Sequence, residues 1–183
     1  RIAENLDDLI DSPIEIGNHE TYFFFFFNVP HELAIYGASN CNILKLMEDL
    51  IKIIEVETAI FGSHPCKNYV FIIHNTDTSY GGLEHKNSSV NHIPRWSYDD
   101  TNYQRAISLL AHEYFHLWNV KRIKPASLIP YNYEKENYTD LLWFFEGVTS
   151  FYDDYVCYKA GVTSKEKYIE IVENNLNEVL NTA

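Results

Sequence analysis

The segment "LLAHEYFHLWNVKRIKP", residues 109–125, places two histidines and a glutamate among apolar side chains. The apolar residues fall on almost every side of a helix, so a helix formed here must be buried nearly all round. Burying ionisable side chains costs free energy unless each of them finds a partner. The sequence therefore predicts a buried helix over about residues 103–119 in which His112, Glu113 and His116 are satisfied by something else.

The spacing of the two histidines decides which chemistry they can support. Residues four positions apart lie on one face of a helix, so His112 and His116 can direct their imidazoles at a single point. Neutral imidazole is a good zinc ligand. Glu113 is rotated around the helix axis, where it can act as a general base on a water beside the metal. The pattern indicates one zinc ion; the alternative is two buried histidines hydrogen-bonded to carboxylates.

A catalytic zinc site has three protein ligands and one position left open for water. Most acidic residues downstream have polar neighbours and are expected in water: Glu134, Glu136, Asp140, Asp153 and Asp154. Glu146 differs, because it lies in the apolar segment "LLWFFEGVTSFY", residues 141–152, where an unpaired carboxylate would be costly. A metal ion would satisfy Glu146, and so would a buried arginine or lysine.

The order of the predicted elements indicates an α+β fold. A fully buried strand is expected at residues 21–29, a helix at about 41–57 and a second strand at 69–74. From residue 102 onward the pattern is helical, with three successive helices that end before Pro125, near Ala160 and near Leu180.

These elements predict a single catalytic domain over residues 1–183 in two halves. The first half, about residues 1–98, mixes strands and helix, and the second, about residues 99–183, is helical. An active site is expected in the cleft between them.

The composition of the chain argues against some classes of binding partner. The chain has 26 acidic and 14 basic residues and a net charge of −12, which argues against nucleic acid as a partner. No apolar run is long enough to span a membrane. The three cysteines have no metal-like or disulfide-like spacing. The N-terminal residues do not resemble a signal peptide, which favours the cytoplasm slightly and leaves the compartment open.

Several motifs in order along the chain resemble the glycyl aminopeptidase family of gluzincin zinc metallopeptidases, and more distantly aminopeptidase N and thermolysin. The resemblance implies a thermolysin-like catalytic domain with one zinc ion, bound by His112, His116 and Glu146, and with Glu113 as general base. It also implies a β domain before this unit and a PDZ-like domain after it. The motifs are "DSPIEIG", "FGSHPCKNYVFIIH", "GGLEHKNSS", "HEYFHLWNVKRIKP" and "LLWFFEGVTSFYDDY".

The segment "GGLEH", residues 81–85, also resembles the exopeptidase motif of the aminopeptidase N group. In that group the glutamate of the motif holds the free α-amino group of the substrate, which implies this role for Glu84. Glycines such as Gly82 let the backbone approach a peptide closely. His85 stands where the family motif has asparagine.

The motifs together predict a zinc-dependent aminopeptidase that cleaves the N-terminal peptide bond of a peptide with a free amino terminus, with a preference for Gly or Ala that the resemblance suggests. The alternatives are a zinc endopeptidase and a catalytically silent peptide-binding module. A tyrosine that stabilises the oxyanion is also expected from the resemblance; Tyr152 and Tyr155 are local candidates. Asn119, Thr149 and Ser150 are candidates to support the ligands.

Overall fold

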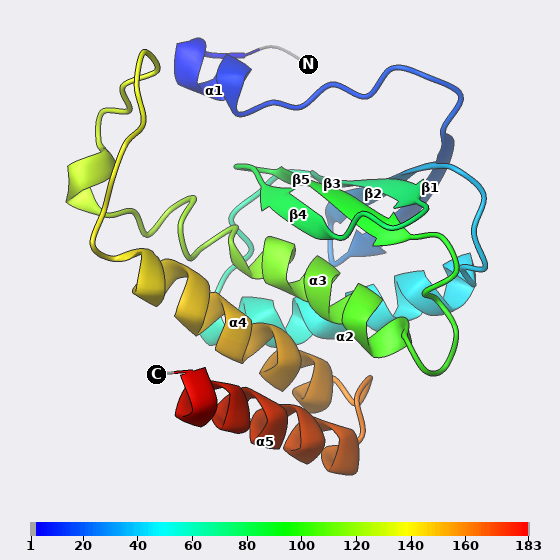
Figure 1. The fold of residues 1–183 in the computed structure, drawn as a ribbon. Coiled ribbons are helices and arrows are strands. Elements are labelled where there is room, and N and C mark those ends of the chain that lie inside the picture. Colours follow the sequence, from blue (N-terminus) through cyan, green and yellow to red (C-terminus); the bar gives the residue numbers. More distant parts are fainter. Residues whose placement is uncertain (1–2, 183) are drawn as a thin grey trace.

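The computed structural model describes residues 3–182, which form one mixed β-sheet and a set of helices (Figure 1). The strands are β1 (Glu20–Phe26), β2 (Val29–Tyr36), β3 (Tyr69–Thr76), β4 (Gly81–Glu84) and β5 (Ser88–Pro94). The α-helices are α1 (Leu6–Ile10), α2 (Ile43–Phe61), α3 (Tyr103–Phe115), α4 (Leu142–Lys159) and α5 (Lys165–Thr182), and Ala126–Leu128 form a short 3-10 helix.

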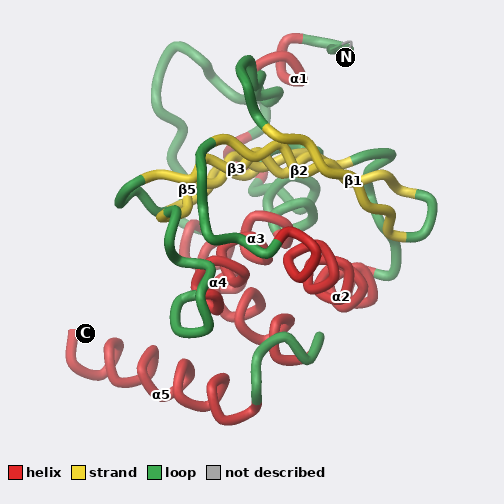
Figure 2. Tube along the Cα trace, turned by 90° about the vertical axis from the view of Figure 1, so that its right-hand side faces the viewer, coloured by secondary structure: helices red, strands yellow, loops and turns green. Residues whose placement is uncertain are grey.

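The sheet has the strand order β1-β2-β3-β5-β4. β2, β3 and β5 run parallel, whereas β1 and β4 pair antiparallel at the two edges. Helices α2 and α3 cover one face of the sheet, and α4 and α5 lie farther out on the same side (Figures 1 and 2). The short edge strand β4 therefore runs beside α3, the helix that carries the two histidines of the motif.

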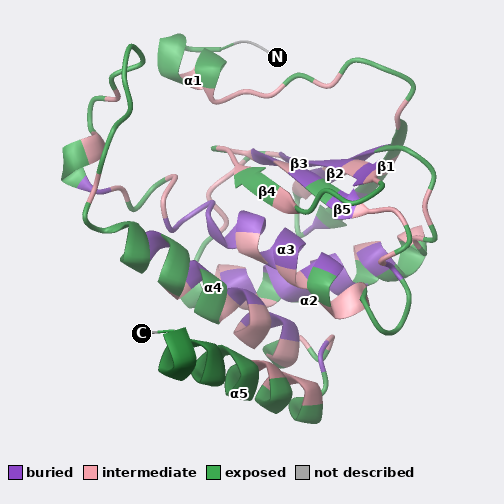
Figure 3. Cartoon of the chain, viewed as in Figure 1, coloured by how far each residue is buried: buried purple, intermediate pink, exposed green. Residues whose placement is uncertain are grey.

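The main hydrophobic core lies between the sheet and helices α2 and α3 (Figure 3). Leu110, Ala111 and Tyr114 of α3 are fully buried in it, against Phe71 and Ile73 of β3. α3 is thus buried nearly all round, as its sequence predicts. The removal of this much apolar surface from water holds α3 in place and fixes the direction of its polar side chains.

The N-terminal segment passes over the opposite face of the sheet, where Ala34, Val70 and Ile72 form a small second cluster (Figure 1). Glu15 of this segment pairs with His74 of β3 at 2.9 Å.

The predicted buried strand at residues 21–29 is wrong in extent and in burial. The strand ends at Phe26, the chain turns at Phe27 with a φ of 49°, and β2 begins at Val29. Because β1 is an edge strand, its side chains alternate: Phe24 points into the core, whereas Phe23 is 63% exposed.

Two helix boundaries also differ from the prediction. α2 begins at Ile43, where the side chain of Asn42 caps it, and ends before Gly62 in the left-handed conformation rather than near residue 57. α3 ends at Phe115, and the chain continues in turns through residues 116–122.

The mixed sheet followed by helices confirms the predicted α+β class. The division into halves near residue 98 falls in the connection between β5 and α3 and stays a prediction. Among the described residues, no helix combines the length and the hydropathy needed to cross a membrane.

Candidate metal centre

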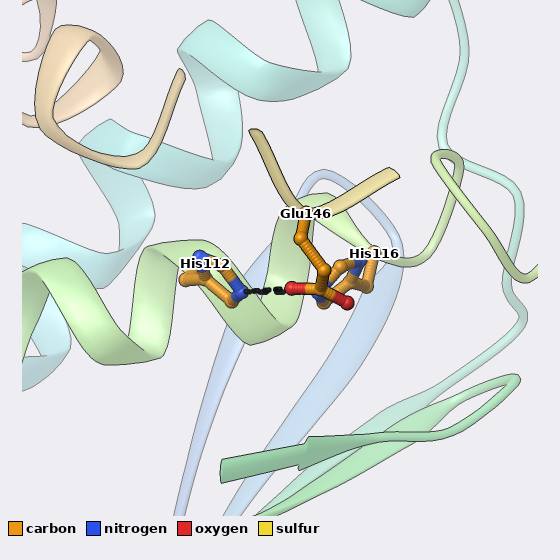
Figure 4. A group of neighbouring side chains, drawn as sticks. All are labelled: His112, His116 and Glu146. Carbon is orange, nitrogen blue, oxygen red and sulfur yellow. Dashed lines mark hydrogen bonds and ion pairs between the residues drawn. The ribbon is translucent and has the colours of Figure 1, made fainter. Parts of the chain in front are cut away.

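The side chains of His112, His116 and Glu146 meet beside the C-terminal end of α3 (Figure 4). The Nε2 atoms of the two histidines lie 3.1 Å apart. Glu146 reaches over from α4, and its Oε2 lies 3.4 Å from Nε2 of His112 and 3.7 Å from Nε2 of His116. The structure therefore brings together the three residues that the sequence motifs indicate as ligands.

Each imidazole is oriented by a hydrogen bond at its other nitrogen. Nδ1 of His112 lies 2.9 Å from Oδ2 of Asp153, and Nδ1 of His116 lies 2.7 Å from the carbonyl oxygen of Asn119. A carboxylate and a carbonyl only accept, so each Nδ1 donates. The lone pair of each Nε2 is therefore available at the centre, the arrangement that metal-binding histidines need.

Asn119 is held in turn by α4. Its side-chain amide donates to the carbonyl of Phe145 at 3.2 Å and to the hydroxyl of Thr149 at 3.1 Å. Asn119 and Thr149 are both buried, at 3% and 0% exposure. The two helices are thus joined by polar contacts directly behind His116, and two of the predicted supporting residues do contact the site.

The facing nitrogens require a positive charge between them, because two imidazole lone pairs repel each other. Burial lowers the pKa of His112, but hydrogen bonds to Asp153 and Glu146 outweigh burial and raise it to about 10. Burial lowers the pKa of His116. The hydrogen bond from His112 is also the main cause that lowers the pKa of Glu146. The centre thus attracts a cation, either a proton or a metal ion.

The donor set fits a zinc ion. Zinc takes imidazole nitrogens and carboxylate oxygens at about 2.0–2.2 Å, so two ligand atoms of a tetrahedral site lie roughly 3.3 Å apart. The three measured separations of 3.1, 3.4 and 3.7 Å bracket this value. His112, His116 and Glu146 could therefore hold one metal ion.

Glu113 lies on the adjoining side of the centre and is 5% exposed. Its Oε2 has no hydrogen-bond partner among the described residues. Burial raises the pKa of Glu113 to about 8, and the nearby charge of His112 offsets this only in part. A buried carboxyl group whose pKa lies near neutrality is suited to accept and return a proton.

Gly82 of β4 faces Glu113 at close range. A β-carbon at position 82 would lie 2.3 Å from Oε1 of Glu113, well inside contact distance. Only glycine allows β4 and this carboxyl group to approach so closely. Gly82 thus leaves room for Glu113, and its predicted role beside a bound peptide stays a prediction.

Glu84 lies at the end of β4 and faces the same cleft. One carboxylate oxygen of Glu84 falls within 4.8 Å of ligand atoms of Glu113 and His116. A cavity of about 600 Å³ extends from here between the N-terminal segment and the loop before α4. Its lining includes Glu84 and Glu146 together with Lys121 and Tyr131.

One expectation about Glu146 is wrong. The apolar sequence of α4 suggested a buried helix, but Trp143 is 70% exposed and the side chain of Glu146 is 49% exposed. The carboxylate is not forced to find a partner by burial. It reaches the histidines because α4 packs across α3.

Asp153 was expected in water and is instead 8% exposed and bonded to His112. Its spacing of seven from Glu146 could have revealed it, since residues seven apart lie on one helix face. The two tyrosines suggested for the oxyanion do not face the centre: Tyr152 stacks on Phe115, and Tyr155 stacks on Phe151.

The chain is similar to known peptidases. Residues 105–183 match the family model of M61 glycyl aminopeptidase. A crystal structure of an aminopeptidase N family protein from Idiomarina loihiensis superposes with a TM-score of 0.86 at 37% sequence identity. The match covers 91% of this chain and 30% of that one, so the chain spans less than a third of the length of this relative. No curated protein matches the chain.

The family match covers α3, α4 and α5, the helices that carry the histidines and Glu146. The structural match extends the likeness over nearly the whole chain, including the sheet and its edge strand β4. Together the two comparisons agree with the sequence motifs: this chain resembles the M61 glycyl aminopeptidase family in its helical part and an aminopeptidase N family protein over nearly its whole length.

Proposed function

We propose that this chain forms the catalytic centre of a zinc-dependent aminopeptidase, which hydrolyses the first peptide bond of a substrate with a free amino terminus. The observation that carries the proposal is the convergence of His112, His116 and Glu146 within 4.8 Å of one another. The match to the family model supports peptidase chemistry. The proposed ligands are the two histidines and Glu146, with one zinc ion.

The chain supplies the groups that such a hydrolysis needs. A bound zinc ion would supply Lewis acidity and a water molecule of lowered pKa. Glu113 takes a proton from the attacking water and passes it to the leaving amine. Its Oε2 supports this role, because none of the described residues forms a hydrogen bond to that oxygen. Asp153 and Asn119 keep the imidazoles in the required tautomer and orientation.

Glu84 gives the proposed enzyme its exopeptidase character. Its carboxylate lies on the same side of the cleft as Glu113 and His116, where it can pair with the α-ammonium group of the substrate. This pairing fixes the cleaved bond at one residue from the amino terminus. An endopeptidase needs no such group, so Glu84 is the feature that favours aminopeptidase over endopeptidase activity.

The proposed preference for Gly or Ala rests on the family resemblance. The cavity of about 600 Å³ beside Glu84 is larger than either side chain requires. Comparing kcat/KM for Gly-, Ala- and Leu-p-nitroanilide tests this part separately, and a higher value for Leu would contradict the preference.

The experiment combines metal analysis with hydrolysis of Gly-p-nitroanilide. The wild-type chain is expected to bind one zinc ion and to release p-nitroaniline. The Glu113→Gln variant should retain zinc and lose about 100-fold or more in kcat. Acetylation of the substrate amino group should abolish hydrolysis; continued cleavage would indicate an endopeptidase. Zinc binding without turnover in both proteins would indicate a silent peptide-binding module.

A further inference from the structure

Asp11 joins three segments of the chain beside the proposed amino-terminus site. It follows α1 in the N-terminal segment, and its Oδ1 accepts from Nζ of Lys121 at 2.9 Å and from Nδ1 of His85 at 3.1 Å. Its Oδ2 accepts from the backbone N–H of Lys86 at 2.7 Å. The carboxylate thus connects the N-terminal segment, the β4–β5 connection and the turns that follow α3. His85, which departs from the family motif, has a partner here.

Lys121 stands between two carboxylates. Among the described residues, Asp11 and Glu84 are the carboxylates within 4.0 Å of its ammonium group, at 2.9 and 3.9 Å. The side chain of Lys121 is only 15% exposed, so water screens its charge poorly. At 3.9 Å the ammonium group is too far from Glu84 for a hydrogen bond, yet it is one small movement from forming one.

A lysine ammonium and a substrate α-ammonium are chemically the same kind of ligand for Glu84. If Lys121 bonded to Glu84, it would occupy the carboxylate that the substrate needs. Burial raises the pKa of Asp11, but hydrogen bonds from His85 and Lys121 outweigh burial and hold it at about 2. Asp11 is therefore ionised at neutral pH and retains the ammonium group of Lys121.

We propose that Asp11 is a positioning residue that holds Lys121 away from Glu84 and so keeps Glu84 free for the amino terminus of the substrate. This inference rests on the role of Glu84 in the proposed function. Loss of the charge at Asp11 removes the stronger partner of Lys121. The ammonium group then turns to Glu84 and competes with the substrate.

The test measures binding of glycinamide, a small primary amine, by NMR titration of the whole chain. Asp11→Asn is expected to weaken binding about tenfold, because a charge-assisted pair is exchanged for competition at Glu84. The double variant Asp11→Asn/Lys121→Gln removes the competitor and should return binding to within about twofold of wild type. Glu15→Gln is the matched control, since it cuts another tie of the N-terminal segment, to His74, and should leave binding unchanged.

Kinetics separate positioning from general damage to the fold. With Gly-p-nitroanilide, Asp11→Asn should raise KM about tenfold and leave kcat within about twofold. A crystal structure of this variant should show Nζ of Lys121 bonded to Glu84. Wild-type binding of glycinamide by Asp11→Asn, or failure of the double variant to recover, would overturn the proposal.

Two further variants keep the outcomes distinct. If Glu84→Gln binds glycinamide as wild type does, Glu84 is not the amine site, and both this inference and the exopeptidase role fail. If Glu84→Gln weakens binding and Asp11→Asn does not, only the role of Asp11 fails. Should Asp11→Asn not fold, Lys121→Gln alone decides: it should bind glycinamide at least as well as wild type, and a tenfold loss would overturn the proposal.

Discussion

Helices α3 and α4 both supply proposed zinc ligands, yet they differ in how firmly they hold them. His116, the C-cap residue of α3, is 1% exposed, and both of its ring nitrogens face protein groups. The side chain of Glu146 of α4 is 49% exposed, and its ion-pair partners among the described residues are the two histidines. One half of the centre is fixed by the core, and the other is presented from a helix with much exposed surface (Figure 3), to which Trp143 and Phe151 contribute apolar side chains.

This difference shows that burial and function need not coincide within one site. The imidazoles of His112 and His116 are held in place by hydrogen bonds to Asp153 and to the carbonyl of Asn119. The carboxylate from α4 gains its position from the docking of α4 on α3, and water can replace it. We therefore expect substitutions on the two helices to have unequal effects, and three experiments test this.

The largest effect is expected for the ligands themselves. Loss of a residue that only supports a ligand lowers metal affinity about 10- to 100-fold, so loss of His116 should exceed about 100-fold. Glu146→Gln should lose less than His116→Gln, because water can enter the half-exposed position. Chelator competition at fixed pH measures both zinc affinities. Glu48→Gln changes an exposed carboxylate on α2 and is the control, which should leave zinc affinity unchanged. Equal losses of zinc affinity at positions 116 and 146 would contradict the expected difference between the two ligands.

The second prediction concerns the contact between α3 and the sheet, and it is tested through the pH dependence of the free energy of unfolding. His31 of β2 is fully buried, and its Nε2 lies 2.8 Å from the hydroxyl of Tyr114 on α3. Burial lowers the pKa of His31 from 6.5 to about 4. The unfolded chain takes up the proton first, so the free energy of unfolding is intact above pH 6.5 and falls by about 3 kcal/mol as the pH drops to 4.

His31→Gln removes this titration and should flatten the loss of stability between pH 6.5 and 4 in urea unfolding. His92→Gln, at an exposed position on β5, is the matched control and should keep the wild-type slope. Parallel pH profiles for His31→Gln and wild type would show that His31 does not remain neutral in the folded protein.

The smallest effect is expected for Asp153 of α4, the buried carboxylate that accepts a hydrogen bond from His112 of α3. Asp153→Asn keeps the size of the side chain but removes its charge, and zinc affinity should fall about 10- to 100-fold. The neighbouring Asp154 bonds to Ser108 instead, and Asp154→Asn should change zinc affinity no more than about threefold. Isothermal titration calorimetry compares the two. A larger loss for Asp154→Asn would contradict the assignment of Asp153 as the partner of His112.

The parts of the site that lie on one helix could be predicted from the sequence, because their geometry is local. His112, Glu113 and His116 follow directly from the helical repeat once the apolar neighbours show that the helix is buried. For Glu146 the burial argument is wrong, since its side chain is half exposed, and the family resemblance was the better guide. Its position depends on how two helices cross, which no local pattern encodes.

The strands that the sequence did not reveal carry polar residues in buried positions. In β5, Ser88, Ser89 and Asn91 are all buried, and the amide of Asn91 donates to the carbonyl of Ile72 on β3. β2 begins with Val29-Pro30 and contains His31 and Glu32, which interrupt its apolar run. Because these polar residues interrupt the apolar pattern of both strands, hydrophobic periodicity alone does not mark them as strands.

The contacts behind His112 and His116 couple cation binding at the centre to the packing of α4 on α3. Asp153 and Thr149 of α4 reach groups of α3, so a partial separation of the two helices would loosen both imidazoles at once. By thermodynamic reciprocity, a cation that binds the closed arrangement more tightly also disfavours that separation at equilibrium. The affinity for the cation and the stability of the contact between α4 and α3 are then thermodynamically coupled, so a change in one changes the other.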